Sequence, residues 1–144
     1  MEYSLLLIKP DAVRGGVNDE ILEVLSKAGL RVMLRRQLYL TASQVEQLYS
    51  EHKDKDFFPH LKDFMTSGPC EVCIIEGDDA INRLNKLCGH NDPQKAEAGT
   101  LRRLYGTGKS ENAVHSPSDR HSFYTELRLL LQVDGVSALF TKSK

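Results

Sequence analysis

Short apolar segments of strand length alternate along this chain with longer segments that have helical periodicity. Two of the apolar segments, Ser4 to Ile8 and Cys70 to Glu76, are compact enough to form buried strands. A third segment, Leu30 to Leu40, alternates well enough between apolar and polar side chains to form another strand. Because strands and helices alternate, the sequence predicts a sheet that is covered by helices.

The segments between these strands carry helix start and stop signals. Helices are expected from Asn18, as the cap, to Ala28 before Gly29; from the capping box Thr41-Ala-Ser-Gln44 to about His52; from Pro59 to Thr66; from a cap at Asp78 or Asp79 to Cys88 before Gly89; from Thr100 to Tyr105; and after a cap at Ser118 or Asp119. Ala113-Val114 is expected to form a brief fourth strand. The order predicts an α+β fold, a ferredoxin-like βαββαβ sandwich with a four-stranded antiparallel sheet and extra helices.

Length and charge limit the classes of function. The 144 residues fit one domain, 1–144, and the net charge of -1 provides no global basic field for binding nucleic acid. No apolar run approaches the length of a membrane span, and the first residues lack the order of a signal peptide. We therefore expect a soluble, cytoplasmic protein without nucleic-acid or membrane partners, in which any anionic ligand needs a local cationic pocket.

The cysteines have the spacing of a metal or redox motif. Cys70 and Cys73 form C-x-x-C, and Cys88 with His90 would complete four zinc ligands. Residues three apart on a strand, however, point to opposite faces of the sheet. The sequence therefore predicts that no metal is bound and that the thiols pack in the core.

A second motif resembles the end of a phosphate-binding P-loop. Gly106-Thr-Gly-Lys-Ser110 has the final residues, but Arg103 occupies the position where the motif requires its first glycine. A polar turn is therefore the expected structure of this segment.

His115 is the candidate nucleophile. A neutral imidazole is a good nucleophile near pH 7 when one ring nitrogen is free and the other is held. Glu126 lies in a segment of helical periodicity and can project back toward the histidine to hold it. The irregular stretches 90–99 and 106–118 flank His115, so the active site is expected between them. Taken alone, such a histidine would more often merely fill or cap a loop.

The segment Asn112-Ala-Val-His115-Ser-Pro-Ser-Asp119 resembles the active-site segment of nucleoside diphosphate kinases. Further landmarks occur in the family's order and spacing: Ile8-Lys-Pro-Asp-Ala-Val13, Tyr49, Phe57-Phe-Pro59 with Leu61, Ser67-Gly-Pro69, Glu76-Gly77, Gly99-Thr-Leu-Arg102 and Glu126. The resemblance implies the ferredoxin-like fold, a homo-oligomer, nucleoside triphosphates and diphosphates as substrates, and Mg²⁺ carried by their phosphates. It also implies ping-pong transfer of the γ-phosphoryl group through a phosphohistidine at His115.

The resemblance assigns a role to each matching residue. Glu126 would hold the catalytic His115; Lys9 and Arg102 would supply positive charge; Lys9 and Asn112 would contact the ribose; Tyr49 would position the histidine; and Phe57 and Leu61 would sandwich the base. Without the resemblance, Lys9 and Arg102 could be solvated charges, Tyr49 a partly buried helix residue, and Phe57 with Phe58 core residues. The charged residues 51–56 are most simply a solvated loop or helix end.

The chain departs from the family pattern around the phosphates. Asn85 and Asn91 stand at the nucleotide-binding positions of an arginine and a threonine, and Ser116-Pro117 replace a glycine and a serine. The hydroxyl that accompanies the glutamate would then come from Ser116 or Ser118, or be absent. Much of the family's C-terminal tail is also missing, so a less robust assembly is expected. Two alternatives stay open: a member with reduced catalysis that senses nucleotides or serves in assembly, and a ferredoxin-like RNA-binding domain.

Overall fold

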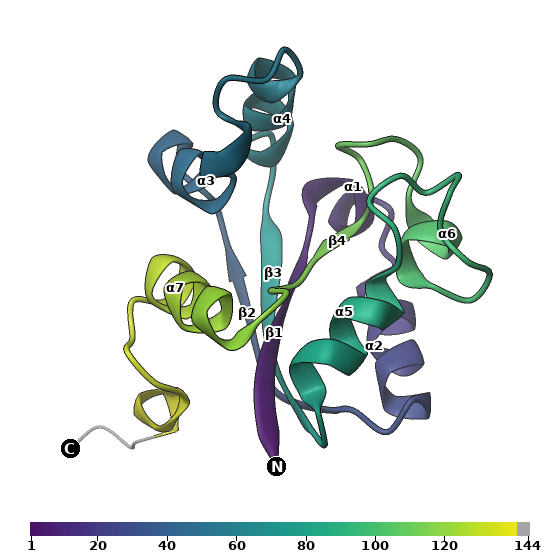
Figure 1. The fold of residues 1–144 in the computed structure, drawn as a ribbon, viewed down its shortest axis with the longest axis vertical. Coiled ribbons are helices and arrows are strands. Elements are labelled where there is room, and N and C mark those ends of the chain that lie inside the picture. Colours follow the sequence, from purple (N-terminus) through teal and green to yellow (C-terminus); the bar gives the residue numbers. More distant parts are fainter. Residues whose placement is uncertain (141–144) are drawn as a thin grey trace.

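An antiparallel sheet forms the centre of the computed structural model, which describes residues 1–140 (Figure 1). Its strands are β1 (Glu2–Ile8), β2 (Arg31–Leu38), β3 (Cys70–Gly77) and β4 (Val114–His115), in the spatial order β2-β3-β1-β4. The central strand β1 pairs with β3 over its whole length, with Leu5 opposite Ile74. This topology confirms the predicted ferredoxin-like βαββαβ arrangement.

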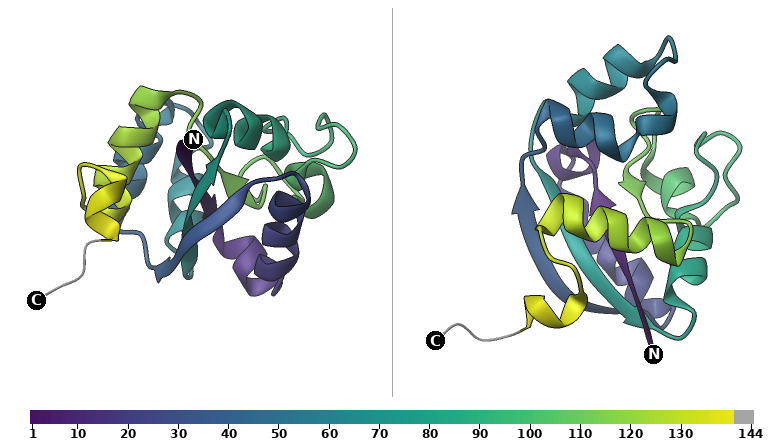
Figure 2. Two further views of the ribbon diagram at one scale, coloured as in Figure 1. Left: turned by 90° about the horizontal axis from the view of Figure 1, so that it is seen from below. Right: turned by 60° about the vertical axis from the view of Figure 1, so that its left-hand side comes forward.

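Helices cover both faces of the sheet (Figures 1 and 2). The helices are α1 (Pro10–Arg14), α2 (Asn18–Lys27), α3 (Ala42–Leu48), α4 (Phe58–Met65), α5 (Ala80–Cys88), α6 (Leu101–Tyr105) and α7 (Arg120–Leu131), with 3₁₀ turns at Ser50–His52 and Val136–Leu139. Helices α3, α4 and α7 lie on one side of the sheet, and α2 and α5 on the other. The end of β1 lies beside the start of β4, where Ile8 pairs with Val114, and this end of the sheet carries the candidate histidine.

Because both faces are covered, successive side chains of β1 and β3 enter two different cores. Leu5 and Leu7 pack with α3, α4 and α7, whereas Leu6 and Ile8 pack with α2 and α5. Cys70 and Cys73 are buried in these opposite cores, as the strand periodicity predicts, so they cannot face one another.

Several predicted helix boundaries change in the structure. The capping box of Thr41 and Gln44 is confirmed, but α3 ends at Leu48 and the chain continues in a 3₁₀ turn, so the helix expected to reach His52 is too long. Asn18 is not a cap: Val17 occupies that position, and the Asn18 amide donates to Glu71 across the chain at 2.7 Å. The local sequence would assign the Asn18 side chain to capping the helix, but this side chain bonds instead to a carboxylate that is distant in the sequence.

Other boundaries shift less. Asp119 caps α7 by accepting a hydrogen bond from Ser122 N at 2.7 Å. Asp79 holds the cap position of α5 without a side-chain cap bond. The expected strand Ala113-Val114 is instead Val114–His115, because Ala113 forms a turn. The one-turn helix α1, with Pro10 in its first turn, was not predicted.

Within residues 1–140 no helix combines the length and the apolar character needed to cross a membrane.

Candidate active site

His115 and Glu126 come together from two different elements. The histidine ends β4 and the glutamate projects from the middle of α7, where His115 Nε2 and Glu126 Oε1 are 2.9 Å apart. Their side chains are only 17% and 12% exposed. An ionised Glu126 accepts a hydrogen bond, so it selects the tautomer with hydrogen on Nε2 and leaves the lone pair on Nδ1. The pair thus has one held nitrogen and one nucleophilic nitrogen.

A tight turn sets the position of His115. Val114 N–H donates to Asn112 O at 2.9 Å, which closes a three-residue turn around Ala113, whose φ is +77°. Non-glycine residues rarely adopt this conformation, and it costs energy. Two long-range bonds hold it: Ala113 N donates to Asp11 Oδ2 at 3.1 Å, and Lys9 N donates to Ala113 O at 2.8 Å. Burial raises the pKa of the Asp11 carboxyl group.

Lys9 brings a buried amine to the site. It follows β1, is 3% exposed, and its Nζ donates to Asn112 Oδ1 at 2.7 Å and to Ser110 O at 3.3 Å. The same atom lies 5.5 Å from the centre of the Tyr49 ring. Burial, with a smaller contribution from the nearby Arg102 charge, lowers the pKa of Lys9 to about 7. The alternative that Lys9 is a solvated surface charge is therefore wrong.

Arg102 is also buried and joins the end of α5 to β4 in the site wall. One terminal nitrogen donates to Gly89 O at 2.7 Å, and the other donates to Val114 O at 2.9 Å. Its Nε is buried and has no hydrogen-bond partner among residues 1–140. The guanidinium group therefore positions β4 behind His115 and brings a fixed positive charge to the cavity wall.

The segment between α3 and α4 supplies the aromatic residues. The Tyr49 ring meets His115 edge-on, with ring centres 5.6 Å apart, and its hydroxyl oxygen is buried without a hydrogen-bond partner in the described part of the chain. Phe57 is 47% exposed, whereas Phe58 is buried in the core. Leu61 is buried with its side chain at the cavity wall. Phe57 thus belongs to the cavity wall and Phe58 to the core.

Three asparagines form a further part of the wall. Asn112 donates to Asn91 O at 2.8 Å and to Lys109 O at 3.1 Å, which links the two irregular stretches that flank the histidine. The Asn91 side chain itself is exposed. Asn85, on α5, donates to Ser116 Oγ at 3.1 Å.

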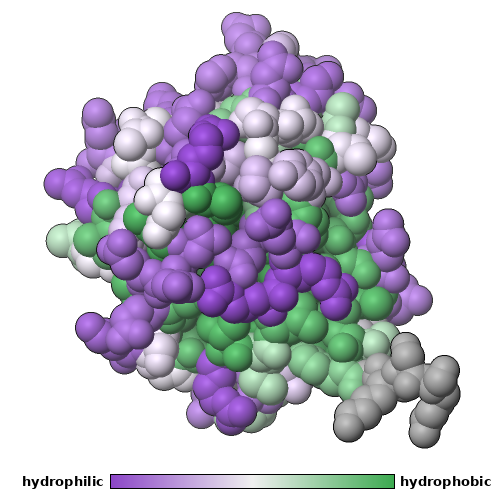
Figure 3. All heavy atoms as spheres, turned by 180° about the vertical axis from the view of Figure 1, so that it is seen from behind, coloured by the Kyte–Doolittle hydropathy of each residue, from purple (hydrophilic) through white to green (hydrophobic). Residues whose placement is uncertain are grey.

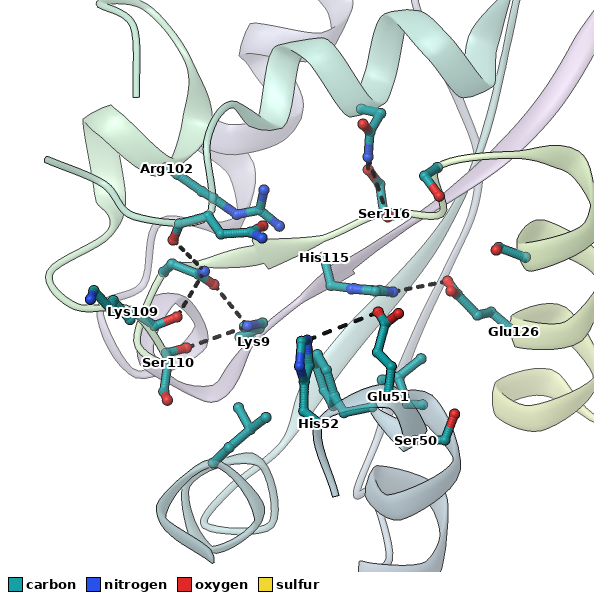
Figure 4. A pocket seen from close by; sticks show the side chains of 18 of the residues that line it. Lys9, Ser50, Glu51, His52, Arg102, Lys109, Ser110, His115, Ser116 and Glu126 are labelled. Carbon is teal, nitrogen blue, oxygen red and sulfur yellow. Dashed lines mark hydrogen bonds and ion pairs between the residues drawn. The ribbon is translucent and has the colours of Figure 1, made fainter. Parts of the chain in front are cut away.

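These residues surround one cavity of about 1030 Å³ (Figure 4). All ten predicted site residues line it: Lys9, Tyr49, Phe57, Leu61, Asn85, Asn91, Arg102, Asn112, His115 and Glu126. The volume is at the upper end for small-molecule sites, and the wall combines an exposed aromatic ring, two buried basic side chains and a nucleophile. Such a cavity can hold a large anion with an aromatic portion and place one end of it beside His115.

Sequence reasoning assigned no role to two residues: His52 in the cavity wall and Asp11 at the turn that precedes His115. His52, placed in a solvated segment by its charged neighbours, is half-buried, with its ring centre 5.4 Å from that of Phe57 and 6.3 Å from that of Tyr49. The nearness of His52 to Tyr49 and Phe57 in the sequence was the signal that could have identified it. Asp11, in the Lys-Pro-Asp landmark, supports the turn before the histidine, and its place in that landmark could have identified it.

Comparisons with known proteins agree with this geometry. The family model described as nucleoside diphosphate kinase matches residues 2–136. Two proteins named nucleoside diphosphate kinase, from Persephonella marina and Staphylothermus marinus, are 40% and 39% identical to this chain; the alignments cover 88% and 94% of it and 91% and 96% of those proteins.

Solved structures give the same result. A nucleoside diphosphate kinase from Encephalitozoon cuniculi has a TM-score of 0.88 at 28% identity, over 93% of this chain and 91% of that one. The enzyme from Halobacterium salinarum, solved in complex with CDP, has a TM-score of 0.86 at 30% identity, over 98% and 99% of the two chains. With its ferredoxin-like sheet and a histidine held by a buried glutamate, this chain belongs to the nucleoside diphosphate kinase family.

Proposed function

We propose that this protein is a nucleoside diphosphate kinase that transfers the γ-phosphoryl group of a nucleoside triphosphate to a nucleoside diphosphate through a phosphohistidine at His115. The observation that carries the proposal is the His115–Glu126 pair, in which Glu126 holds Nε2 and leaves the lone pair on Nδ1 for attack. Two buried basic side chains, Lys9 and Arg102, line the same cavity. Family membership supports the same activity.

In the first half-reaction, the Nδ1 lone pair forms a bond to the γ-phosphorus while the bond to the bridging oxygen breaks. The electron pair of that bond leaves with the nucleoside diphosphate. The imidazole ring becomes positively charged as the new bond forms, and the Glu126 carboxylate at Nε2 stabilises this charge. In the second half-reaction, a terminal oxygen of the acceptor diphosphate attacks the phosphohistidine and restores the neutral ring.

Phosphoryl transfer requires mainly positioning and positive charge on the non-bridging oxygens. Lys9 and Arg102 would supply that charge, and Asn112, fixed by Lys9 at 2.7 Å, would reach the ribose hydroxyl groups. Mg²⁺ would enter bound to the phosphates as part of the substrate. We expect these reactions in the cytoplasm, as the sequence predicts.

The base would lie against Phe57 and Leu61. Phe57 is 47% exposed inside a cavity wall, which leaves its ring face available for stacking. Stacking tolerates any base because each base has a π-face. The H. salinarum relative was solved with CDP, a pyrimidine nucleotide, and we propose that this chain accepts purine and pyrimidine nucleotides alike.

One observation favours a second candidate function. Asn85 stands where the resemblance implies a phosphate-binding arginine, and its amide is occupied by Ser116. A chain with slow turnover could then serve as a nucleotide sensor or assembly module. Measured turnover with a saturating triphosphate and diphosphate separates the two functions.

The decisive experiment uses a triphosphate labelled at its γ-phosphate. We expect the label to stay on the protein, to be acid-labile and base-stable, and to pass to an added diphosphate. His115→Gln should remove the label, whereas His121→Gln, which changes another histidine at the cavity wall, should keep it. If His115→Gln retains both the acid-labile label and full transfer, the proposed mechanism is wrong.

A further inference from the structure

The residue directly after the nucleophile carries a buried hydroxyl group. Ser116 is 6% exposed and lines the cavity that contains His115. Figure 4 shows Ser116 and Lys9 on different sides of His115, with Ser116 toward α5. A phosphoryl group bound to His115 would therefore have the cationic side chains on one side and this hydroxyl group on another.

The hydrogen bonds around Ser116 restrict where its proton points. Asn85 Nδ2 donates to Ser116 Oγ at 3.1 Å and approaches the Ser116 carbonyl oxygen at 3.5 Å, so the amide presents its nitrogen to the serine. Cys88 Sγ approaches the same Oγ at 3.4 Å. Burial raises the pKa of the Cys88 thiol, which keeps its S–H available as a donor.

A hydroxyl group has one proton to donate and two lone pairs to accept with. At Ser116, both lone pairs face donors, one from Asn85 and one from Cys88. The O–H bond is then left for a third partner. Since the remaining side of the serine is cavity, an oxygen of a bound anion is the partner that this arrangement accommodates.

We propose that Ser116 is a catalytic residue that donates a hydrogen bond to a non-bridging oxygen of the phosphoryl group while it moves to and from His115, and that Asn85 is a positioning residue that orients the serine hydroxyl. The proposal rests on the function proposed above. No proton changes place: the phosphorus–Nδ1 bond forms, the phosphorus–oxygen bond to the leaving diphosphate breaks, and the serine O–H bond stays intact. The contact strengthens as charge develops on the transferring group.

Ser116→Ala removes the donor with little change in volume. We expect the single-turnover rate of phosphohistidine formation at saturating triphosphate to fall about ten- to a hundredfold, the range for a hydrogen bond to a charged group. The Kd of a diphosphate for the unphosphorylated protein should change less than about threefold, because that complex lacks the transferring phosphoryl group. Ser116→Thr, which keeps a hydroxyl group, should recover part of the rate, and Ser26→Ala on the distant helix α2 serves as the control.

A double-mutant comparison tests whether Asn85 acts through Ser116. Asn85→Leu removes the amide donor and should slow phosphohistidine formation in the wild-type background. In the Ser116→Ala background the same change should have little further effect, because no hydroxyl remains to be oriented. If the two effects multiply independently, Asn85 does not act through Ser116 and its positioning role is wrong.

The outcomes separate this inference from the proposed function. If the wild-type protein forms no acid-labile, base-stable label, the proposed function fails. If the wild-type protein is labelled and the rate of Ser116→Ala lies within about threefold of the wild-type rate, only the role of Ser116 is overturned. Loss of a hydrogen bond to a charged group would slow the reaction by more than that. A parallel loss of diphosphate affinity and of Tm, with an unchanged rate at saturation, would show that Ser116 supports the fold and would also overturn its catalytic role.

Discussion

At the scale of single residues, burial controls the charge of Lys9. The amine is enclosed by Asn112, Ser110 and the Tyr49 ring, so its positive form is poorly solvated and its pKa falls to about 7. A phosphate group beside it would favour the charged form. Nucleotide binding and protonation of Lys9 are therefore coupled.

We predict that diphosphate binding takes up close to one proton at pH 8. At that pH the free protein holds Lys9 mostly neutral, since its pKa is about 7. The bound phosphate raises this pKa, so the complex gains a proton, and affinity falls as the pH rises above 7. Calorimetry in buffers of different ionisation enthalpy measures the uptake, which should nearly vanish at pH 6 and in Lys9→Met. Equal uptake in Lys9→Met at pH 8 would assign the proton to another group.

Glu126 permits a second prediction at this scale. Glu126→Gln can still accept a hydrogen bond from Nε2, but it loses the charge that stabilises the developing imidazolium ion. We expect phosphohistidine formation to slow by about ten- to a hundredfold, as for loss of one charge-stabilising group. Glu51→Gln changes another carboxylate at the cavity wall and is the control. Rapid-quench measurements with both variants would show whether the charge itself matters.

At the scale of secondary structure, α3 and α4 form a unit that carries the aromatic part of the site. A capping box begins α3, and the Gln44 side chain also donates to Leu129 O of α7 at 3.1 Å. The unit holds Tyr49 against His115 and leaves Phe57 exposed at the cavity wall. The hydrogen bonds that begin α3 and the exposed ring of Phe57 can be tested separately.

Thr41→Ala removes the hydroxyl group that accepts from Gln44 N at 3.1 Å. We expect the free energy of unfolding to fall by about 1 kcal/mol, the usual effect of losing such a cap. Thr41→Ser keeps the hydroxyl acceptor, so its free energy of unfolding should fall much less. Urea denaturation of the two variants and the wild-type protein gives the comparison, and equal stability of all three would contradict a capping role.

Phe57→Ala should weaken the binding of all nucleotides by a similar amount. Base stacking contributes about 1–3 kcal/mol and does not depend on base identity. The values of kcat/KM for four diphosphates should therefore fall together, while Tyr39→Ala, an exposed aromatic residue outside the cavity, leaves them unchanged. In the wild-type protein, a preference above roughly 10⁴ for one base would indicate specific hydrogen bonding to the base instead.

At the scale of the whole molecule, the sheet has an open edge at β2. Among the described residues, 1–140, this strand pairs only with β3, and it carries exposed Arg31, Arg35 and Arg36 among partly buried apolar residues. Figure 3 shows that apolar side chains gather on the lower part of the back of the molecule, with strongly hydrophilic side chains between them. An unpaired strand edge with apolar neighbours can associate with a second copy.

We predict a homo-oligomer that dissociates on dilution. Light scattering over a dilution series should give a mass above that of the 16.2 kDa chain at high concentration and a fall toward it at low concentration. A single-chain mass at every concentration would contradict assembly altogether. Adding salt at constant protein concentration would show how much the β2 arginines contribute.

The sequence by itself determined the strands, most of the helices and the division of the central strands between two cores. These features follow from local periodicity: successive residues of a strand face opposite sides, which is why Cys70 and Cys73 are separated. The capping box of Thr41 was also local and was predicted correctly. The resemblance to the family selected ten of the residues that line the cavity.

Only the tertiary structure decided the states of those residues. Lys9 meets Asn112 across 103 positions of sequence, and this contact, with the enclosing wall, decides that the amine is buried. Burial of Phe58 but not Phe57 and the positive φ of Ala113 likewise depend on segments far away in the chain. Periodicity reports only which side of its own element a residue occupies. Desolvation, and with it charge and pKa, depends on what the rest of the chain places against that side.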